Sequence, residues 1–177
     1  MLKSILNPFR KSYNSEELNL FGFLQKVRLF ERLSYEEMAL FVPYLYLRQY
    51  KNEEAVFFRG DPSHALYIIK SGEIALNIDV KDKFEELSRI YPGDAFGDNT
   101  VIENATRIFT SVVVSDNAEL YVIPQVNLLQ IMNDNTVIRA KVMTSFAEIY
   151  NAYSANLVKS YRNHFGFFDL SLAYKRR

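Results

Sequence analysis

The sequence contains no cysteine and only two histidines among its 177 residues. Without cysteine, a disulfide framework, a thiolate nucleophile and a zinc–thiolate site are all excluded, and a reducing compartment is the natural location. A cupin-type metal centre needs clustered histidines, whereas His64 lies in a turn-like segment and His164 lies near the C-terminus. Neither histidine has an evident partner that would activate a serine nucleophile. We therefore expect no catalytic residues, no metal site and no enzymatic activity.

Net charge and long apolar runs are also absent from the sequence. The 21 basic and 21 acidic residues give a formal net charge of zero, so a global electrostatic attraction to nucleic acid is not expected. No segment reaches the roughly 18 continuous apolar residues of a membrane-spanning helix, and the N-terminus lacks the apolar run of a signal peptide. We expect a cytoplasmic protein. A hydrophobic fraction of 49% in a chain of this length predicts one globular body with appended segments.

The first 44 residues are expected to form a lead-in and two short helices. Residues 1–15 mix polar, basic and apolar side chains, and an N-cap should end this segment just before Glu16. Apolar residues at helical spacing then predict a helix over 16–27. The sequence Ser-Tyr-Glu-Glu at 34–37 is typical of a capping box and predicts a second helix that continues to residue 42.

Residues 45–124 consist of short apolar or alternating runs separated by turn signals such as Gly60-Asp61-Pro62 and Pro92-Gly93. This pattern is typical of antiparallel β structure. The number and spacing of the runs predict a mainly β fold, an antiparallel jelly-roll barrel or sandwich with flanking helices. The expected strands are 45–50, 55–58, 65–70, 73–80, 84–90, 108–114 and 119–124, with a polar hairpin tip at 81–83.

Residues 125–159 are expected to be helical. A short helix over 126–132 should be followed by a long helix over about 136–159, with Asn133 or Asn135 as its N-cap. The long helix carries an apolar stripe that can pair with a second copy of the chain or pack on the chain's own barrel. The stripe consists of Ile138, Val142, Phe146, Ile149, Tyr153 and Leu157.

Residues 160–177 form a basic, aromatic tail that ends in Lys175, Arg176 and Arg177. Three terminal cations are more typical of a solvated tail than of a nucleic-acid or membrane contact. The segment is also too short to hold a winged helix-turn-helix, so a DNA-binding domain is not expected within it.

The segment FGDNTVIENATR at 96–107 contains the most informative chemistry of the chain. Gly97 permits a close approach of the backbone to a ligand, and the residues after it can open a short helix whose free N–H groups face an anion. Arg107 offers a planar, permanently charged fork for phosphate oxygens. A carboxylate such as Asp98 repels phosphate and is expected to accept hydrogen bonds from sugar hydroxyls. The pattern predicts a site for a small phosphorylated ring, although the same charges in isolation would be solvated loop residues.

Three further segments accompany this motif. They are KNEEAVFFRGDPSHALYIIKSGEIAL at 51–76, YPGDAFGD at 91–98 and AELYVIP at 118–124. In this order, roughly over 27–157, the chain resembles the cyclic nucleotide-binding domain family, of the catabolite activator protein and cyclic-AMP-dependent kinase regulatory subunit type. The resemblance implies a jelly-roll barrel followed by a long helix, and it assigns residues 96–110 to the phosphate-binding cassette of that family.

By this resemblance, Gly97 offers its backbone to the ligand, Asp98 stands for the glutamate that binds the ribose 2′-hydroxyl, and Arg107 pairs with the cyclic phosphate. Family members carry small or hydroxyl residues after the arginine, whereas this chain has Ile108 and Phe109. A donor on the phosphate side is therefore missing, and the added bulk can fill the pocket. The predicted cyclic nucleotide-binding residues are Phe96, Gly97, Asp98, Asn99, Thr100, Arg107, Ile108 and Phe109.

Asn99 and Thr100 replace an apolar and a small residue of the family pattern. Their side chains can cap the cassette helix and compete with a ligand for the same N–H groups. Asp98 is also one methylene shorter than the glutamate of the family, which predicts a longer or water-bridged contact with the ribose.

The resemblance implies a non-enzymatic regulatory module that senses a purine 3′,5′-cyclic nucleotide, cAMP or cGMP, and transmits the signal through the C-terminal helix. No cofactor is implied beyond this ligand. The alternative is a ligand-free scaffold for protein–protein interaction or dimerisation, in which Ile108 and Phe109 occupy the pocket. In the family the long helix commonly forms a parallel homodimer and often caps the base. Side chains available for capping are Tyr150, Tyr153, Asn156 and Lys159, although aromatic residues at this spacing also suit a core or a dimer contact.

Overall fold

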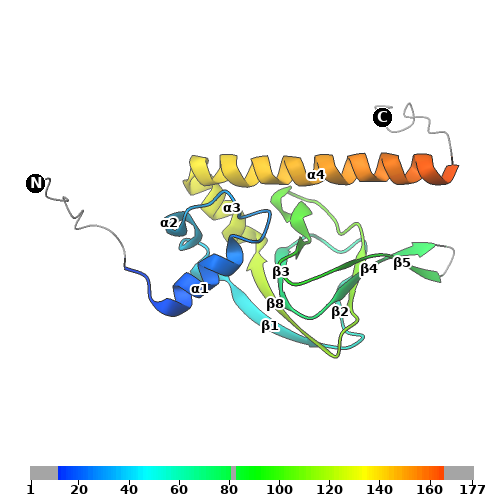
Figure 1. Cartoon of the computed structure of the whole chain (residues 1–177), viewed down its shortest axis with the longest axis horizontal. Helices are drawn as coiled ribbons and strands as arrows, with labels where there is room; N and C mark the ends of the chain where they lie inside the picture. Colours follow the sequence, from blue (N-terminus) through cyan, green and yellow to red (C-terminus); the bar gives the residue numbers. More distant parts are fainter. Residues whose placement is uncertain (1–11, 81–82, 166–177) are drawn as a thin grey trace, which may run out of the picture.

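The computed structural model describes residues 12–80 and 83–165, which form a two-sheet β sandwich covered by helices on one side. Figure 1 shows the N-terminal helices and α3 gathered below the first half of a long straight helix, α4. The antiparallel jelly-roll type of fold expected from the sequence is confirmed. None of the helices in the described ranges has the length and hydropathy required to cross a bilayer.

The N-terminal part contains α1 (Ser15–Leu24), α2 (Tyr35–Met38) and the short 3₁₀ helix η1 (Val42–Tyr44). Both α-helices begin with a complete capping box, Asn14 with Glu17 and Ser34 with Glu37. The helices end earlier than predicted, at Leu24 instead of residue 27 and at Met38 instead of residue 42. After Leu24 the chain turns through a series of i to i+3 hydrogen bonds, because this path buries Val27, Leu29 and Phe30 completely or nearly so.

The sandwich has two four-stranded sheets, ordered β1-β8-β3-β6 and β2-β7-β4-β5, and each pairing is antiparallel. The strands are β1 (Tyr46–Lys51), β2 (Ala55–Phe57), β3 (Ala65–Ser71), β4 (Ile74–Val80), β5 (Lys83–Ile90), β6 (Ala95–Phe96), β7 (Thr110–Val113) and β8 (Asn117–Pro124). Seven were expected, within a few residues at each end. The two-residue β6 was missed because so short a strand has no periodicity to detect.

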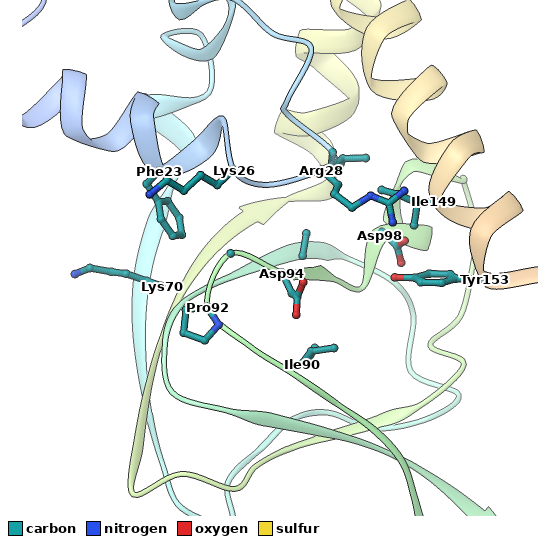
Figure 2. A pocket seen from close by; sticks show the side chains of 13 residues that line it. Phe23, Lys26, Arg28, Lys70, Ile90, Pro92, Asp94, Asp98, Ile149 and Tyr153 are labelled. Atoms are coloured by element: carbon teal, nitrogen blue, oxygen red, sulfur yellow. The ribbon is translucent and has the colours of Figure 1, made fainter. Parts of the chain in front are cut away.

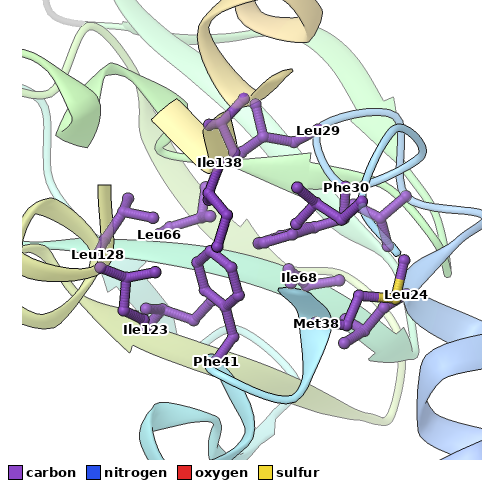
Figure 3. Packing of buried hydrophobic residues seen from close by; sticks show 14 of the residues in the cluster. Leu24, Leu29, Phe30, Met38, Phe41, Leu66, Ile68, Ile123, Leu128 and Ile138 are labelled. Carbon is purple, nitrogen blue, oxygen red and sulfur yellow. The ribbon is translucent and has the colours of Figure 1, made fainter. Parts of the chain in front are cut away.

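Strand β3 is buried on both faces and therefore divides the hydrophobic core into two clusters. Leu66 and Ile68 pack with the helices, whereas the intervening Tyr67 and Ile69 point into the sandwich, as the alternation of a strand requires. Figure 3 shows the larger cluster, in which side chains from α1, α3, α4 and β8 surround Phe30 and Phe41. The face of β3 inside the sandwich carries the second cluster and is the face that bears on function.

The C-terminal part consists of α3 (Gln125–Asp134) and α4 (Thr136–Phe165). Asn135 separates them, and its Oδ1 accepts hydrogen bonds from the backbone N–H groups of Val137 and Ile138 at 3.1 Å. Of the two predicted N-caps, Asn135 is therefore the one used. Helix α4 continues through Phe165, beyond the expected end at residue 159, and residues 166–177 of the predicted tail lie outside the described ranges.

The predicted apolar stripe of α4 has two different environments. Its first four residues are buried in the larger core cluster, and two ion pairs of 2.7 Å, Lys141 with Glu37 and Arg32 with Glu148, fasten the same half to the N-terminal segment. By contrast, Tyr153 is 54% exposed and Leu157 is 68% exposed. Packing on the chain's own body therefore uses the first half of the stripe and leaves the second half uncovered.

This division predicts unequal effects of alanine substitutions along one stripe. Ile138→Ala removes a fully buried side chain and should lower the free energy of unfolding by about 2–5 kcal/mol. Leu157→Ala, the matched control on the same helix, should change it by no more than about 0.5 kcal/mol in a monomer. Urea denaturation followed by circular dichroism measures both. Equal losses would show that the second half of α4 packs elsewhere.

Candidate functional site

The predicted cassette begins where β6 ends. Gly97 has a left-handed backbone with φ of +68°, and the 3₁₀ helix η2 (Asp98–Val101) follows directly. A Cβ at Gly97 would collide with the guanidinium of Arg107. Glycine is therefore required both by the torsion angle and by a close approach, but the group that approaches is a side chain of the same protein.

The backbone segment at residues 105–107, which includes Arg107, is hydrogen-bonded to the turn that contains Gly60. The backbone N–H of Arg107 donates to the carbonyl oxygen of Asp61 at 2.7 Å, and its own carbonyl accepts from the N–H of Gly60 at 2.9 Å. The N–H of Ser63 donates to the carbonyl of Ala105 at 2.8 Å. These contacts explain why β7 starts at Thr110 instead of residue 108, since the preceding residues pair with the turn.

Arg107 is only 4% exposed, and its guanidinium points into the protein. Nη1 donates to Ser63 Oγ at 2.8 Å and to the Gly97 carbonyl at 3.0 Å, and Nη2 donates to the Ala65 carbonyl at 2.7 Å. Nε is buried and has no partner among the described residues. A permanently charged group therefore sits in the interior with neutral acceptors and one unsatisfied donor.

Aromatic rings from two strands and the start of the cassette surround this guanidinium. Its carbon lies 4.2 Å from the centre of the Phe57 ring and 5.5 Å from that of Tyr67, both within cation–π range. Phe96 stacks on Tyr67 with ring centres 5.2 Å apart. Burial lowers the pKa of the Arg107 guanidinium, and the neighbouring Tyr67 and Asp61 oppose this effect.

Asn99 and Thr100 connect the cassette to the Gly60 turn instead of capping η2, as had been expected. Ser63 Oγ donates to Asn99 Oδ1 at 2.8 Å, and Asn99 Nδ2 donates to the Thr106 carbonyl at 2.7 Å. The Thr100 hydroxyl donates to the Ser63 carbonyl at 2.8 Å. The result is a buried polar network in which Ser63 contacts the arginine and both cassette residues.

Asp98 opens η2, and no side-chain hydrogen bond caps this helix among the described residues, so the expected free N–H groups at its start stay a prediction. The nearby backbone N–H groups of Asp98 and Asn99 act to lower the pKa of the Asp98 carboxylate. Burial nevertheless raises the pKa of Asp98, and the negative charge of Asp98 helps to raise the pKa values of Tyr150 and Tyr153 on α4. Asp98 thus lies at the boundary between the cassette and the long helix.

Ile108 and Phe109 do not have the predicted position inside a pocket. Ile108 is 52% exposed, and Phe109 is partly buried. The bulk beside the guanidinium comes from Phe57, Tyr67 and Phe96 instead. The chain bends at residues 108 and 109 before β7 begins, and this bend carries Ile108 to the surface.

A cavity of about 610 Å³ lies between the N-terminal segment, the turn before β6 and α4. Figure 2 shows it with Asp98 and Tyr153 on one side and Lys26 and Lys70 on the other. Arg107 does not line it. Of the side chains proposed to cap a base, Tyr153 borders this cavity, Tyr150 packs on Phe146 with ring centres 4.4 Å apart, and Asn156 and Lys159 are exposed.

Sequence reasoning missed Ser63, Phe57 and Tyr67 as parts of the site. Ser63 follows the Gly-Asp-Pro turn, and serine is a common residue in turns, so it gave no functional signal. Its contact with Arg107 joins residues that are 44 positions apart in the sequence. The two rings fit a hydrophobic strand equally well whether or not they face a cation. The available signal was the strand alternation, which places Tyr67 on the interior face together with Ile69.

Comparisons with known proteins agree with this architecture. A family model described as the cyclic nucleotide-binding domain matches residues 47–135. The chain is 34% identical over 103 residues to a cAMP-dependent protein kinase regulatory subunit of Mycosarcoma maydis. The aligned residues cover 57% of this chain and 20% of that protein. It is 30% identical over 89 residues to the Cyclic AMP receptor protein of Thermus thermophilus, 50% of this chain and 41% of that one. The chain therefore spans less than half the length of these curated relatives.

Solved structures share the fold at lower sequence identity. The crystal structure of the Thermus thermophilus Catabolite Activator Protein aligns with a TM-score of 0.64 at 24% identity, over 76% of this chain and 64% of that one.

The environment of Asp98 predicts a pH dependence of stability. Because its pKa is raised in the folded protein above the ordinary value of about 3.9, the folded state binds more protons than the unfolded state between the two values. The free energy of unfolding of the wild type, minus that of Asp98→Asn, should therefore fall as the pH rises through this window. Denaturant titrations from pH 3 to 8 measure this difference, with Asp79→Asn, a substitution of an exposed residue near the end of β4, as the baseline. A difference that increases with pH would contradict the argument.

Proposed function

The chain belongs to the cyclic nucleotide-binding domain family, and on this basis we propose that it is a non-enzymatic regulatory module that binds a purine 3′,5′-cyclic nucleotide, cAMP or cGMP. The observation that carries the proposal is the buried guanidinium of Arg107, whose Nε lacks a partner among the described residues. A phosphate oxygen is an acceptor that suits this donor. The cytoplasmic location expected from the sequence stays a prediction.

The exchange of acceptors at Arg107 is favourable in energy. Its present partners are a hydroxyl and two carbonyls, which are neutral, whereas a cyclic phosphate carries a full negative charge. The guanidinium is charged in both cases, and a phosphate adds a Coulomb attraction between opposite charges that a neutral acceptor does not offer. A buried unsatisfied donor also costs about 1–3 kcal/mol, which a phosphate contact would recover. Binding would thus replace weaker contacts of the same guanidinium.

The interior face beside Arg107 offers a second unsatisfied polar atom. Ser111 is fully buried on β7, and its Oγ has no partner among the described residues. Ser111 is the register partner of Phe57, so its side chain shares the face on which the Phe57 ring contacts the guanidinium. We propose that Ser111 supplies the hydroxyl that sequence reasoning expected directly after the arginine. The proposed site is therefore Arg107, Gly97 and Ser111.

Transmission to the C-terminal helices has a direct route in the contacts of Gln125, the first residue of α3. Its side-chain amide donates to the carbonyls of Thr100 at 2.8 Å and Ile102 at 3.3 Å. Its backbone N–H donates to the carbonyl of His64 at 2.7 Å. A cassette that shifts to admit a ligand would carry α3 with it, and α4 follows after Asn135. The ligand can bias the position of α4 only by its difference in affinity for the two positions.

A ligand-free scaffold is the second candidate function, and one observation favours it. Both terminal nitrogens of Arg107 are already bonded within the protein, and the guanidinium is stacked on Phe57. In that case the arginine serves only to join β3, the cassette and the Gly60 turn. The two candidates differ in what a cyclic nucleotide does to the protein.

Calorimetric titration with cAMP and cGMP separates the two functions. Arg107→Lys keeps the positive charge but loses the fork, and it should weaken binding by about 10- to 100-fold, the equivalent of one charge-assisted contact. Arg48→Ala, on exposed β1, is the matched control and should bind as the wild type does. Absence of heat at millimolar ligand, with a folded protein by circular dichroism, would leave only the scaffold. Binding of unchanged affinity in Arg107→Lys would mean that the phosphate binds elsewhere.

We also propose that the second half of α4 mediates a homodimer, because Tyr153 and Leu157 are exposed there, one turn apart on the same side of the helix. Leu157→Glu should convert the dimer to a monomer in sedimentation velocity. Ala155→Glu adds the same charge at about 200° around the helix and should leave the dimer intact. Phe146→Glu is not suitable, since Phe146 belongs to the core. A wild-type chain that sediments as a monomer at high concentration would refute the dimer.

A further inference from the structure

We propose that the cavity beneath α4 is a second ligand site, which takes a small amphoteric molecule with an acidic group at one end and an amine at the other. The cavity is distinct from the interior site at Arg107, which does not line it, and it shares only Asp98 with the predicted cassette residues. Its volume of about 610 Å³ lies within the range of roughly 300–1,000 Å³ typical of small-molecule sites.

The cavity is built by three parts of the chain that are distant in sequence. The segment at the end of α1 contributes Phe23 and Leu29, the turn before β6 contributes Pro92, and α4 contributes Ile149 and Tyr153. These side chains give the walls an apolar character. The cavity therefore favours a ligand with an apolar carbon skeleton over a bare inorganic ion, because a small ion would leave the apolar walls exposed to water.

One end of the cavity is cationic. Lys26 and Lys70 lie on the same side of it in Figure 2, next to Phe23. Within residues 12–80 and 83–165 the ammonium group of Lys26 has no hydrogen-bond or salt-bridge partner. Lys70 is paired with Glu119 at 2.9 Å, and this pair is partly exposed. Glu119 balances much of the charge of Lys70, so the net positive charge at this end comes from Lys26 and suits a carboxylate or a phosphate.

The opposite end is acidic. Asp94 and Asp98 both line the cavity, and Figure 2 shows the Asp98 carboxylate next to the Tyr153 hydroxyl, with Asp94 between Asp98 and the lysine side. All three groups line the same cavity, and the charges of Asp98 and Asp94 add to burial in raising the pKa of Tyr153. Arg28 lies beside them and compensates part of the negative charge. One oxygen of Asp94 accepts the N–H of Tyr91 at 2.9 Å, so the other oxygen can accept from an ammonium group.

The two ends together decide the class of ligand. A simple anion would be attracted by Lys26 but repelled by Asp94 and Asp98. A simple cation would be attracted by the two carboxylates but repelled by Lys26. A molecule that carries both charges satisfies each end at once. Carboxylate and phosphate are equivalent at the basic end, so the acidic group of the ligand is left to the experiment.

Occupation of this site would affect the position of α4. Ile149 is 7% exposed and is the last fully packed residue of the stripe, whereas Tyr153, one turn later, is 54% exposed. Both line the cavity, which therefore lies where α4 leaves the core. A bound molecule would add contacts to the first uncovered turn and hold the second half of α4 in place.

Calorimetric titration with matched probes tests the site in the complete chain. The two-ended probes are 6-aminohexanoate and O-phosphoethanolamine, and the one-ended probes are hexanoate and hexylamine. We expect at least one two-ended probe to bind about tenfold more tightly than either one-ended probe, and comparison of the two identifies the acidic group. Equal binding of one-ended and two-ended probes, or no heat from any of the four at millimolar concentration, would overturn the proposal.

Variants locate the binding and separate it from the cyclic nucleotide site. Lys26→Gln and Asp94→Asn should each weaken the two-ended probe by about two- to fivefold, the effect of one partly exposed ion pair. Lys51→Gln, an exposed lysine on β1, should have no effect. Arg107→Lys should also leave the probe affinity unchanged, and Lys26→Gln should leave any cAMP affinity unchanged. Probe binding that is lost in Arg107→Lys but retained in Lys26→Gln would assign it to the interior of the sandwich and refute the second site.

Discussion

The burial of one guanidinium constrains the whole centre of this molecule. Arg107 brings a permanent charge into the sandwich, and the protein meets it with the hydroxyl of Ser63, the carbonyls of Gly97 and Ala65, and the face of Phe57. The β6–η2 junction, the Gly60 turn and the start of β3 must all reach the same point. A charge this deeply buried is tolerated only with such partners, so the arginine determines the path of three loops whether or not a ligand replaces some of them.

Much of the fold was predictable because the relevant signals are local. Both capping boxes, seven strands and the glycine at 97 follow from side chains a few positions apart. The candidate site was only partly predictable, since Arg107 meets Ser63 and Ala65 across more than 40 positions. The family pattern singles out Arg107, whose role in binding stays a prediction, and it does not state what the guanidinium contacts. The expectation that Ile108 fills the pocket was wrong, because the chain bends after Arg107 and leaves Ile108 52% exposed.

Strand β3 links the two candidate ligand regions. Its first residues hold Arg107 on the sandwich side, and Lys70 near its end borders the outer cavity. Asp98 lies between the regions, as part of the cassette and of the cavity wall. Strand β3 is buried on both faces, so both regions are built on the same rigid element of a close-packed interior. Both regions also contact the C-terminal helices, the cassette through Gln125 and the cavity through Tyr153.

The single-residue junction at Asn135 gives α4 a mechanical property of its own. With 30 residues the helix is about 45 Å long. A tilt of only about 5° at the junction would displace its far end by about 4 Å, as a lever arm of that length requires. Sub-ångström adjustments around the cassette can thus become motions large enough for another macromolecule to detect, and the unpacked half of the helix is the part that travels farthest.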